Sequence, residues 1–404
     1  MSTTSRVWLA GDLGTFRGGS GFPIRHQGKK SGDLPFFKVS DMNSGGNELF
    51  MTRANNYISE AQRKTLGAVR MPAQAIVFAK VGAAVFQERK RILAQDSCID
   101  NNMAAFIVDK GKLDVRFAHY LLTAFRMSDL VAVGALPSLN GRQLRSIPLL
   151  VPSDLAEQRR IVAALADADS LIATLERLIA KKQAIKQGMM QQLVTGRTRL
   201  PGCDGEWTVV SIDSLARVTG GGTPSTRVSS YWGGGIPWFT PAEIRSGGSG
   251  LVATSERTIT QEGLASSAAA LLPKDSVLVT SRASIGNCAV AAVPVTTNQG
   301  FTSMIPRDHR STWFLYYWVQ QNRAELESRA AGSTFLEISA SKVAAIPLTA
   351  PSLLEQQSIG QVLRDVDTEI GAFESRLAKA RAVKTGMMQQ LLTGRVRLPV
   401  EDES

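Results

Sequence analysis

The residues able to do chemistry are few in this chain and lie far apart. The histidines and cysteines are too widely separated to form a metal site or a disulfide framework: His26, His119, His309, Cys98, Cys203 and Cys288. The sequence has no Gly-x4-Gly-Lys-[Ser/Thr] phosphate loop and no Gly-x-Gly-x-x-Gly between a strand and a helix. No nucleophile, base and orienting group stand together. We therefore expect a binding protein, and the three cysteines fit a reduced cytoplasm.

The charge balance favours a polyanionic partner. The net charge is +11, and arginine outnumbers lysine 31 to 15, which suits bidentate contacts with phosphate and guanine. Residues 1–201 carry 28 Lys/Arg against 16 Asp/Glu, whereas residues 202–404 carry 18 against 19. The longest uncharged run, residues 283–306, contains Asn, Gln, Gly and Pro, so we expect buried strands there and no membrane span.

An internal repeat organises the whole chain. Glu157–Pro201 aligns without a gap to Glu355–Pro399, with 24 of 45 positions identical at an offset of 198. The preceding segments match more weakly, for example Leu34-Pro35-Phe36-Phe37-Lys38 with Ile236-Pro237-Trp238-Phe239-Thr240. Each half therefore consists of about 150 residues of mixed structure followed by one long helix.

The two repeated helices carry apolar residues at heptad spacing, which predicts a coiled-coil seam. The predicted packing residues are Ile161, Leu165, Ile172, Leu175 and Ile179 in the first helix and Ile359, Leu363, Ile370, Phe373 and Leu377 in the second. The helices should pack on each other antiparallel, which would make the chain's two termini neighbours. The alternative is an amphipathic helix that lies on its own domain. Lysines interrupt the stripe, where the seam would loosen or meet another chain: Lys182, Lys186 and Lys384.

Start and stop signals bound each helix. Asp154-x-x-Glu157 and Ser352-x-x-Glu355 resemble capping boxes, so the Glu-Gln pairs at 157–158 and 355–356 are interpreted as caps rather than a catalytic carboxylate and amide. Gly196 and Gly394 mark the helix ends.

The mixed segments read as α+β units built from short strands. Strands are predicted at Pro35–Val39, Ala75–Lys80, Met103–Val108, Pro237–Phe239, Ser276–Ser281 and Thr302–Ile305. One helix per unit is expected, at Arg116–Met127 and Thr312–Ala330. The fold class is therefore α+β, with two pseudo-symmetric domains joined by two long antiparallel coiled-coil helices.

These motifs resemble a known family. Each mixed unit ends in Ile-Pro-x3-Pro (Ile147–Pro152, Ile346–Pro351), and the helix that follows closes in Leu-[Val/Leu]-Thr-Gly-Arg-x-Arg-Leu. This order, present twice, is similar to the specificity subunit of type I restriction-modification systems. Ser281–Gly286 and Asn298–Phe301 also resemble recognition-domain patterns of that family, whereas the first half departs from them at Lys80–Ala83 and Asn101–Met103.

The resemblance implies a non-catalytic, sequence-specific DNA-recognition subunit. Two target-recognition domains would each read one part of a bipartite double-stranded target, and the paired helices would set the spacer and dock two adenine-methylating modification subunits. Two restriction (motor-nuclease) subunits would complete the complex, so S-adenosylmethionine, ATP and Mg are expected on the partners and no cofactor or metal on this chain. The predicted regions are 1–151 and 201–350 for recognition, 152–200 and 351–399 for the spacer helices, and 400–404 for an acidic tail.

Candidate DNA-contacting residues are polar side chains at repeat-matched turns. They are Lys38, Ser40, Lys80 and Arg142 in the first domain and Thr240, Glu243, Ser281, Arg282, Asn298 and Lys342 in the second, together with the basic run Arg89, Lys90 and Arg91, expected to face phosphates. Residues 1–151 hold 20 basic and 11 acidic residues, and residues 202–350 hold 11 of each. We therefore expect the first domain to supply more phosphate contacts. Two alternatives stay open: a helical scaffold, or a DNA-modifying enzyme with an unrecognised site.

Overall fold

A computed structural model describes residues 5–131, 137–244, 250–331 and 336–398. The predicted acidic tail at 400–404 lies outside these ranges. The chain divides into two compact units, unit 1 with Met1–Ala173 and Lys379–Ser404, and unit 2 with Thr174–Ala378. The two segments of unit 1 bring the ends of the chain into one unit, where Gly394 lies beside Ser5.

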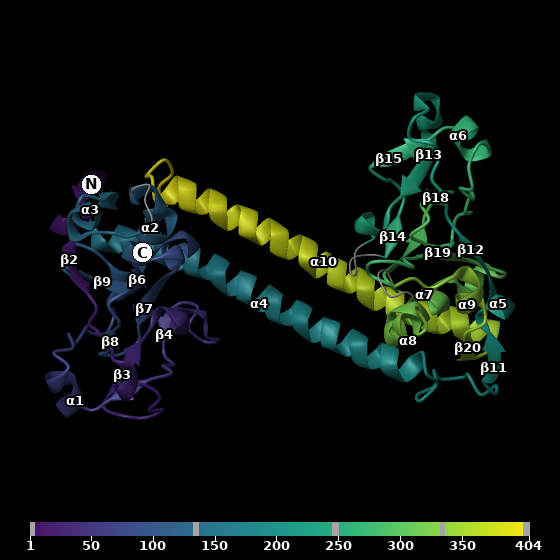
Figure 1. Cartoon of the computed structure of the whole chain (residues 1–404). Coiled ribbons are helices and arrows are strands. Elements are labelled where there is room, and N and C mark those ends of the chain that lie inside the picture. Colours follow the sequence, from purple (N-terminus) through teal and green to yellow (C-terminus); the bar gives the residue numbers. More distant parts are fainter. Residues whose placement is uncertain (1–4, 132–136, 245–249, 332–335, 399–404) are drawn as a thin grey trace, which may run out of the picture. The chain divides into compact units, whose positions relative to one another are not determined.

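Unit 1 contains three small sheets (Figure 1). A five-stranded sheet has the order β2 (Gly14–Gly18), β9 (Met103–Val108), β6 (Ile76–Ala79), β7 (Lys90–Leu93) and β4 (Phe50–Met51). A three-stranded sheet has the order β5 (Tyr57–Ile58), β3 (Leu34–Phe37) and β8 (Cys98–Ile99), and β1 (Ser5–Leu9) pairs with β10 (Pro148–Pro152). The short helices are α1 (Glu60–Thr65), α2 (Val115–Ala124) and α3 (Gly141–Arg145).

Unit 2 repeats this topology strand for strand. Its five-stranded sheet has the order β12 (Ala216–Gly220), β19 (Thr302–Pro306), β16 (Val277–Val279), β17 (Cys288–Ala291) and β14 (Leu251–Val252). Its other sheets are β15 (Arg257–Ile259), β13 (Trp232–Phe239) and β18 (Thr296–Thr297), and the pair β11 (Thr208–Ser211) and β20 (Pro347–Ala350). The short helices are α5 (Ile212–Leu215), α6 (Gln261–Ala265), α7 (Thr312–Gln321), α8 (Arg323–Ser328) and α9 (Ala340–Ala344).

The sequence predicts one helix at Thr312–Ala330, whereas the structure has two, α7 and α8. The chain breaks at Asn322 into α7 and α8, and the Asn322 side chain donates a hydrogen bond to the Trp318 carbonyl at 2.9 Å. A short polar side chain that bonds to backbone competes with the helical ladder, which explains the break. The β9 strand, by contrast, has the bounds predicted from sequence.

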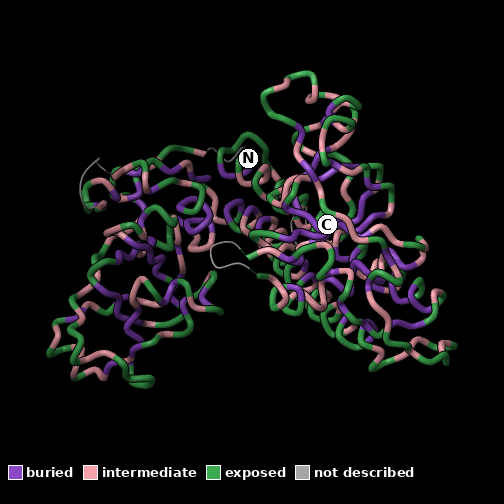
Figure 2. The backbone as a smooth tube through the Cα atoms, turned by 45° about the vertical axis from the view of Figure 1, so that its right-hand side comes forward, coloured by how far each residue is buried: buried purple, intermediate pink, exposed green. Residues whose placement is uncertain are grey.

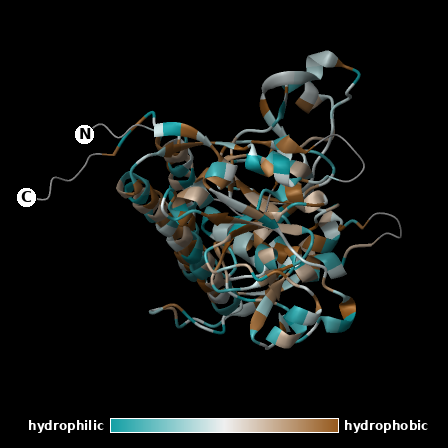
Figure 3. Ribbon diagram, turned by 90° about the vertical axis from the view of Figure 1, so that its left-hand side faces the viewer, coloured by the Kyte–Doolittle hydropathy of each residue, from teal (hydrophilic) through white to brown (hydrophobic). Residues whose placement is uncertain are grey.

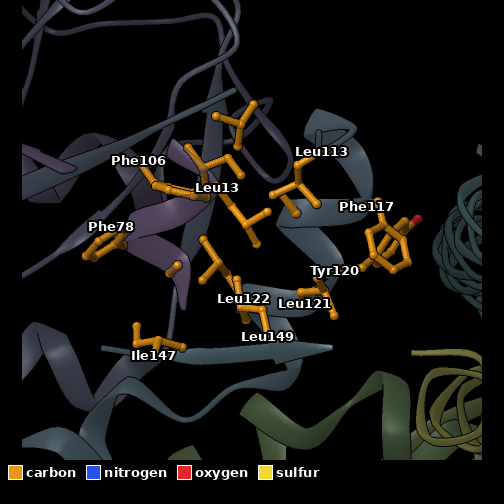
Figure 4. Packing of buried hydrophobic residues seen from close by; sticks show 14 of the residues in the cluster. Leu13, Phe78, Phe106, Leu113, Phe117, Tyr120, Leu121, Leu122, Ile147 and Leu149 are labelled. Atoms are coloured by element: carbon orange, nitrogen blue, oxygen red, sulfur yellow. The ribbon is translucent and has the colours of Figure 1, made fainter. Parts of the chain in front are cut away.

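The core of unit 1 lies between the five-stranded sheet and α2 (Figure 4). Phe78 and Phe106 from the sheet and Phe117 from α2 are each at most 1% exposed. Asp114 caps α2 by accepting hydrogen bonds from the backbone N–H groups of Arg116 and Phe117 at 2.8 and 3.0 Å. Strands β3, β6, β8 and β9 are almost entirely buried, whereas β1 and β2 are partly or fully exposed; Figure 2 shows buried and exposed stretches along the chain.

The two long helices are α4 (Leu155–Leu193) and α10 (Leu353–Leu391), each 39 residues long. Both pass from one unit into the other. Hydrophilic and hydrophobic residues alternate along them (Figure 3), which is the pattern of a helix with one packed face. Gly196 and Gly394 follow the helix ends with φ of +71° and +64°, the left-handed conformation that a glycine stop requires.

The predicted packing positions serve two interfaces at once. Ile161 and Leu165 of α4 are at most 3% exposed and pack with both the unit 1 core and Leu391 of α10. Ile359 and Leu363 of α10 do the same in unit 2 with Leu193 of α4. Antiparallel packing and packing on the adjacent domain are therefore both realised. Of the remaining positions, Leu175, Ile179 and Ile370 are buried, and Ile172, Phe373 and Leu377 are partly exposed.

Candidate nucleic-acid interface

Several strand ends meet at one edge of unit 1. Because β3 and β8 are parallel, both carboxyl ends lie together, and Asp100 N donates to the Phe37 carbonyl at 2.9 Å. The turn after β8 also contacts the end of β6, because Lys80 N donates a hydrogen bond to the Asn102 carbonyl at 2.8 Å. We call this the unit 1 polar edge: Lys38, Lys80, Arg89, Asn101 and Asn102.

A close backbone approach closes each polar edge and explains one repeated glycine. A Cβ at Gly19 would lie 1.9 Å from the Asp100 carbonyl oxygen, and one at Gly221 would lie 2.1 Å from that of Asn298. A side chain at either position would push the strand end away from the turn, so glycine is required at both.

Lys38 and Lys80 place cations on the unit 1 polar edge. Lys38 Nζ donates to Gln27 Oε1 at 3.0 Å, and Lys80 Nζ lies beside Gly18. Asp100, 5% exposed, lies under them; burial raises the pKa of its carboxyl group above the ordinary value, although backbone hydrogen bonds from Asn102 and Val39 and the nearby Lys38 oppose that shift. Ser40 is exposed. The edge therefore offers fixed donors and positive charge, as phosphate binding needs.

The basic run 89–91 divides between surface and core. Arg89 donates hydrogen bonds to Asn43 Oδ1 and Gln87 Oε1 at the surface, and Arg91 is partly exposed. Lys90 is 2% exposed, pairs with Glu88 and donates to the Phe125 carbonyl at 3.2 Å. The expectation that Lys90 faces phosphate is therefore wrong, because Lys90 lies on the same face of β7 as Ile92, which packs in the unit 1 core. Burial lowers the pKa of Lys90, and Glu88 opposes that shift.

Unit 2 builds the corresponding edge with neutral side chains at the positions of Lys38 and Lys80, which are Thr240 and Ser281. Asn298 N donates to the Phe239 carbonyl at 3.0 Å, and Ser281 N donates to the Gly300 carbonyl at 2.8 Å. Thr223 Oγ1 donates to Gln299 Oε1 at 2.6 Å on the same turn. The unit 2 polar edge is Thr240, Ser281, Arg282, Asn298 and Gln299, and it matches unit 1 in backbone but not in charge.

Two candidate DNA-contacting residues of unit 2, Glu243 and Ser281, are tied into the loops that carry them. Glu243 Oε2 accepts from the Thr240 backbone and hydroxyl at 2.7 and 2.8 Å, and its Oε1 accepts from Glu256 N at 2.8 Å. Ser281 is 1% exposed. The expectation of a base contact is wrong for Ser281, because its side chain is enclosed. Glu243 is partly exposed and its carboxylate accepts three hydrogen bonds within the loop, so its base contact stays a prediction. Asp41 plays the matching role in unit 1, where it accepts from Lys38 N at 2.7 Å.

The short helices α3 and α9 bring the remaining candidates to the edges. Leu139 N donates to the Lys80 carbonyl at 2.8 Å just before α3, and Ile338 N donates to the Ser281 carbonyl at 3.2 Å just before α9. The candidates Arg142, Arg282 and Lys342 are exposed. Arg282 pairs with Glu337 at 2.8 Å, and Lys342 Nζ donates to the Arg329 carbonyl at 3.1 Å.

A sequence-family comparison decides the relationship. The family model described as "Type I restriction modification DNA specificity domain" matches residues 9–187 and, a second time, residues 204–379. The chain belongs to this family. The two matches fall on the two halves that the internal repeat and the duplicated topology define.

Individual relatives agree with the assignment. The MjaIX specificity subunit of Methanocaldococcus jannaschii is 38% identical over 164 residues, 40% of this chain and 38% of that protein, so the alignment spans well under half of the relative. The EcoR124I/EcoR124II specificity subunit of Escherichia coli is 27% identical over 235 residues, 55% of this chain and 56% of that protein. The type I S subunit of M. genitalium has the same fold, with a TM-score of 0.62, 14% identity, and coverage of 97% and 96% of the two chains.

A three-residue lock, present twice, joins the α+β part of each unit to both long helices. In unit 2, the Asp367 carboxylate on α10 accepts from the Tyr317 hydroxyl of α7 at 2.7 Å and pairs with Lys186 of α4 at 2.7 Å. Asp367 is 6% exposed. Burial and the neighbouring carboxylate raise the pKa of Tyr317 above its ordinary range. Asp367 thereby links α4, α7 and α10.

Unit 1 repeats the lock with Tyr120, Asp169 and Lys384. The Tyr120 hydroxyl donates to Asp169 Oδ2 at 2.7 Å, and Lys384 pairs with the same carboxylate. Burial and this hydrogen bond raise the pKa of Tyr120 to about 12. Lys182 adds a pair with Glu369 at 2.7 Å in unit 2. The lysines therefore close the seam by pairing across it, and the expectation that they loosen it is wrong.

The Glu-Gln pairs at the helix starts do more than cap. The Glu355 carboxylate accepts two hydrogen bonds from Arg199 at 2.6 and 2.7 Å, and Glu157 pairs with Arg397 at 3.9 Å. Capping falls to Ser352, whose Oγ accepts from Glu355 N at 3.4 Å, and to Asp154, which accepts from Ala156 N at 2.8 Å. Gln158 ties α4 to the α+β part of unit 1 by accepting from Asp114 N at 2.8 Å. The second arginine of Thr-Gly-Arg-x-Arg thereby anchors the start of the opposite helix.

Sequence reasoning missed the lock aspartates and their tyrosines. One signal was present: Asp169 with Asp367 and Lys186 with Lys384 each recur at the offset of 198. Within the described residues, no three His, Cys, Asp or Glu side chains are grouped as metal ligands, and no helix has both the length and the apolar content to cross a bilayer.

Proposed function

We propose that this chain is the DNA-reading subunit of a type I restriction-modification complex, with each unit's polar edge facing one part of a bipartite double-stranded target. The observation that carries the proposal is that the two units share one backbone topology but carry different side chains on their polar edges. Two identical readers would need only one edge chemistry, whereas these edges differ in charge at matched positions, Lys38 against Thr240 and Lys80 against Ser281.

The edges suit the two tasks of DNA recognition. Cations on a rigid backbone bind phosphates and fix the position along the duplex, and amide side chains at the groove read base edges. Unit 1 offers Lys38, Lys80 and Arg89 for the first task and Asn101 and Asn102 for the second. Unit 2 offers Arg282 and Lys342 with Asn298 and Gln299. The choice of individual base contacts stays a prediction.

The proposal assigns no catalytic step to this chain. It places methylation of adenine on two modification subunits and translocation and cleavage on two restriction subunits, with S-adenosylmethionine, ATP and Mg bound there. The long helices, held in register by the two locks, would dock the modification subunits and fix the distance between half-targets. The complex would act in the cytoplasm, where its DNA lies.

Single-molecule methylome sequencing of the host, with and without the gene, tests the proposal. We expect one bipartite methylated motif to vanish with the gene and to return with a plasmid copy. A K38A/K80A variant should weaken methylation at that motif without moving it to another sequence. An unchanged methylome after deletion would refute the proposal.

The two other classes of function give different results. A helical scaffold would produce no sequence-specific footprint even with modification subunits present. A DNA-modifying enzyme would modify or cleave DNA as a purified single chain supplied with cofactor.

A further inference from the structure

The loop between β6 and β7, residues 80–89, carries an exposed phenylalanine at the unit 1 polar edge. Phe86 is 57% exposed and lies in the short 3-10 helix η4 (Ala83–Gln87). Because β6 and β7 are antiparallel, with Phe78 opposite Lys90, the loop begins at Lys80 and ends at Arg89, both on the polar edge. A large apolar side chain thus lies on the same loop as Lys80 and Arg89, two cations suited to bind phosphate.

The loop holds Phe86 outward by anchoring the residues around it. Val85 is 3% exposed and packs in the unit 1 core. Glu88 takes a left-handed φ of +53°, its N–H donates to the Val85 carbonyl at 3.2 Å, and its carboxylate accepts from Ser128 N at 2.8 Å and pairs with Lys90. With its neighbours anchored on both sides, the backbone at Phe86 would lose little conformational freedom on binding.

The matching loop of unit 2 has no such side chain. It spans residues 280–287, two residues fewer, between β16 and β17. Ile285, 4% exposed, takes the inward place of Val85. The next residue is Gly286, where a Cβ would lie 2.9 Å from Arg323 Cγ. Unit 1 therefore carries an outward side chain where unit 2 has room for none.

We propose that Phe86 is an apolar contact residue of the first recognition domain, packing against a base or sugar in the groove of its half-target. The proposal rests on the proposed function. Flanking side chains favour DNA as the occupant, since Arg89 and Lys80 supply positive charge and Gln87 a hydrogen-bonding amide beside the ring. Apolar side chains contact thymine methyl groups and sugars in the same grooves where cations hold phosphates.

The test measures affinity against salt for a duplex carrying the motif identified by methylome sequencing, with the chain assembled with its modification subunits. F86A should bind about ten-fold more weakly at every salt concentration with an unchanged slope of log K against log salt, because a hydrocarbon contact releases no counterions. R89A should instead reduce the slope. F86W should keep most of the affinity, and its indole emission should change on binding the motif but not an unrelated duplex.

Phe50 provides the matched control. It is 37% exposed on β4, which pairs with β7 at Ile92 and Leu93, away from the polar edge. F50A should bind as the wild type does. Wild-type affinity of F86A, or equal losses for F86A and F50A, would overturn the inference while leaving the proposed function intact. Failure of the wild-type complex to bind the duplex would overturn both.

Discussion

Replacing Asp367 with alanine should destabilise unit 2 by about 3 kcal/mol. The carboxylate is 6% exposed and satisfies the Tyr317 hydroxyl and the Lys186 ammonium, each at 2.7 Å. Removing one partner of a buried pair costs about 3–5 kcal/mol. The lower end applies here, because Lys186 is 16% exposed at its side chain and can reach water. D367N should cost less, since its amide oxygen still accepts from Tyr317.

Tryptophan fluorescence suits the assay, because five of the six tryptophans lie in unit 2: Trp207, Trp232, Trp238, Trp313 and Trp318. A loss of about 3 kcal/mol should lower the melting temperature of a unit of this size by about 6–12 °C. The control is E325A, which removes an exposed pair between Glu325 of α8 and Arg329, the residue after its end, and should cost under about 1 kcal/mol.

A double-mutant cycle sharpens the result. K186M should make D367A less costly than it is in the wild-type background, because the unpaired cation has already been removed. A D367A variant that melts within 1 °C of E325A, or costs that add fully in K186M/D367A, would refute the reasoning that the lock is a coupled buried unit.

Three further predictions follow from the same contacts. G196A should lower the free energy of unfolding more than G394A. Both positions need a positive φ, but only a Cβ at residue 196 would meet the Trp207 ring, at 3.1 Å. Equal losses of the two variants in urea unfolding would contradict this. Burial lowers the pKa of His119 to about 4 despite a hydrogen bond with the Lys90 carbonyl, so the unfolded chain binds the proton more tightly than the folded chain. The stability of the fold should therefore be full above pH 6.5 and fall by about 3 kcal/mol as the pH drops to 4. H119F should flatten this pH dependence in thermal unfolding. K38A/K80A should reduce the salt slope of DNA binding by about 1 for each lost phosphate contact, whereas K112A, which pairs with Asp109 at 3.4 Å, should leave it unchanged; binding isotherms at several salt concentrations decide.

The long elements could be predicted because their signals are local and repeated. Heptad spacing, a polar cap and a glycine stop place α4 and α10 within one residue of their observed starts. The three-stranded sheets could not be predicted, since β5, β8 and β18 are two residues long and show no periodicity. Their pairing depends on partners far along the chain.

The candidate site was predictable in position but not in orientation. Matched turns drew attention to Lys80 and Asn298, which the structure brings to corresponding edges; their contact with DNA stays a prediction. Lys90 was misplaced, because the run of charges at 88–91 hides the start of a strand that is largely buried on both faces. Glu355 was assigned to a cap because the sequence cannot show that its partner, Arg199, lies 156 positions away.

The locks have a consequence for the origin of the chain. Each half contains a complete set of partners: Tyr120, Asp169 and Lys186 in the first, and Tyr317, Asp367 and Lys384 in the second. Two copies of a single half could therefore satisfy both locks by exchanging lysines across a twofold axis. The repeat is what fusion of two such copies into one chain would leave. After such a fusion the lock residues would have to stay the same in both halves, because they contact one another. The two polar edges do not contact one another and would be free to diverge.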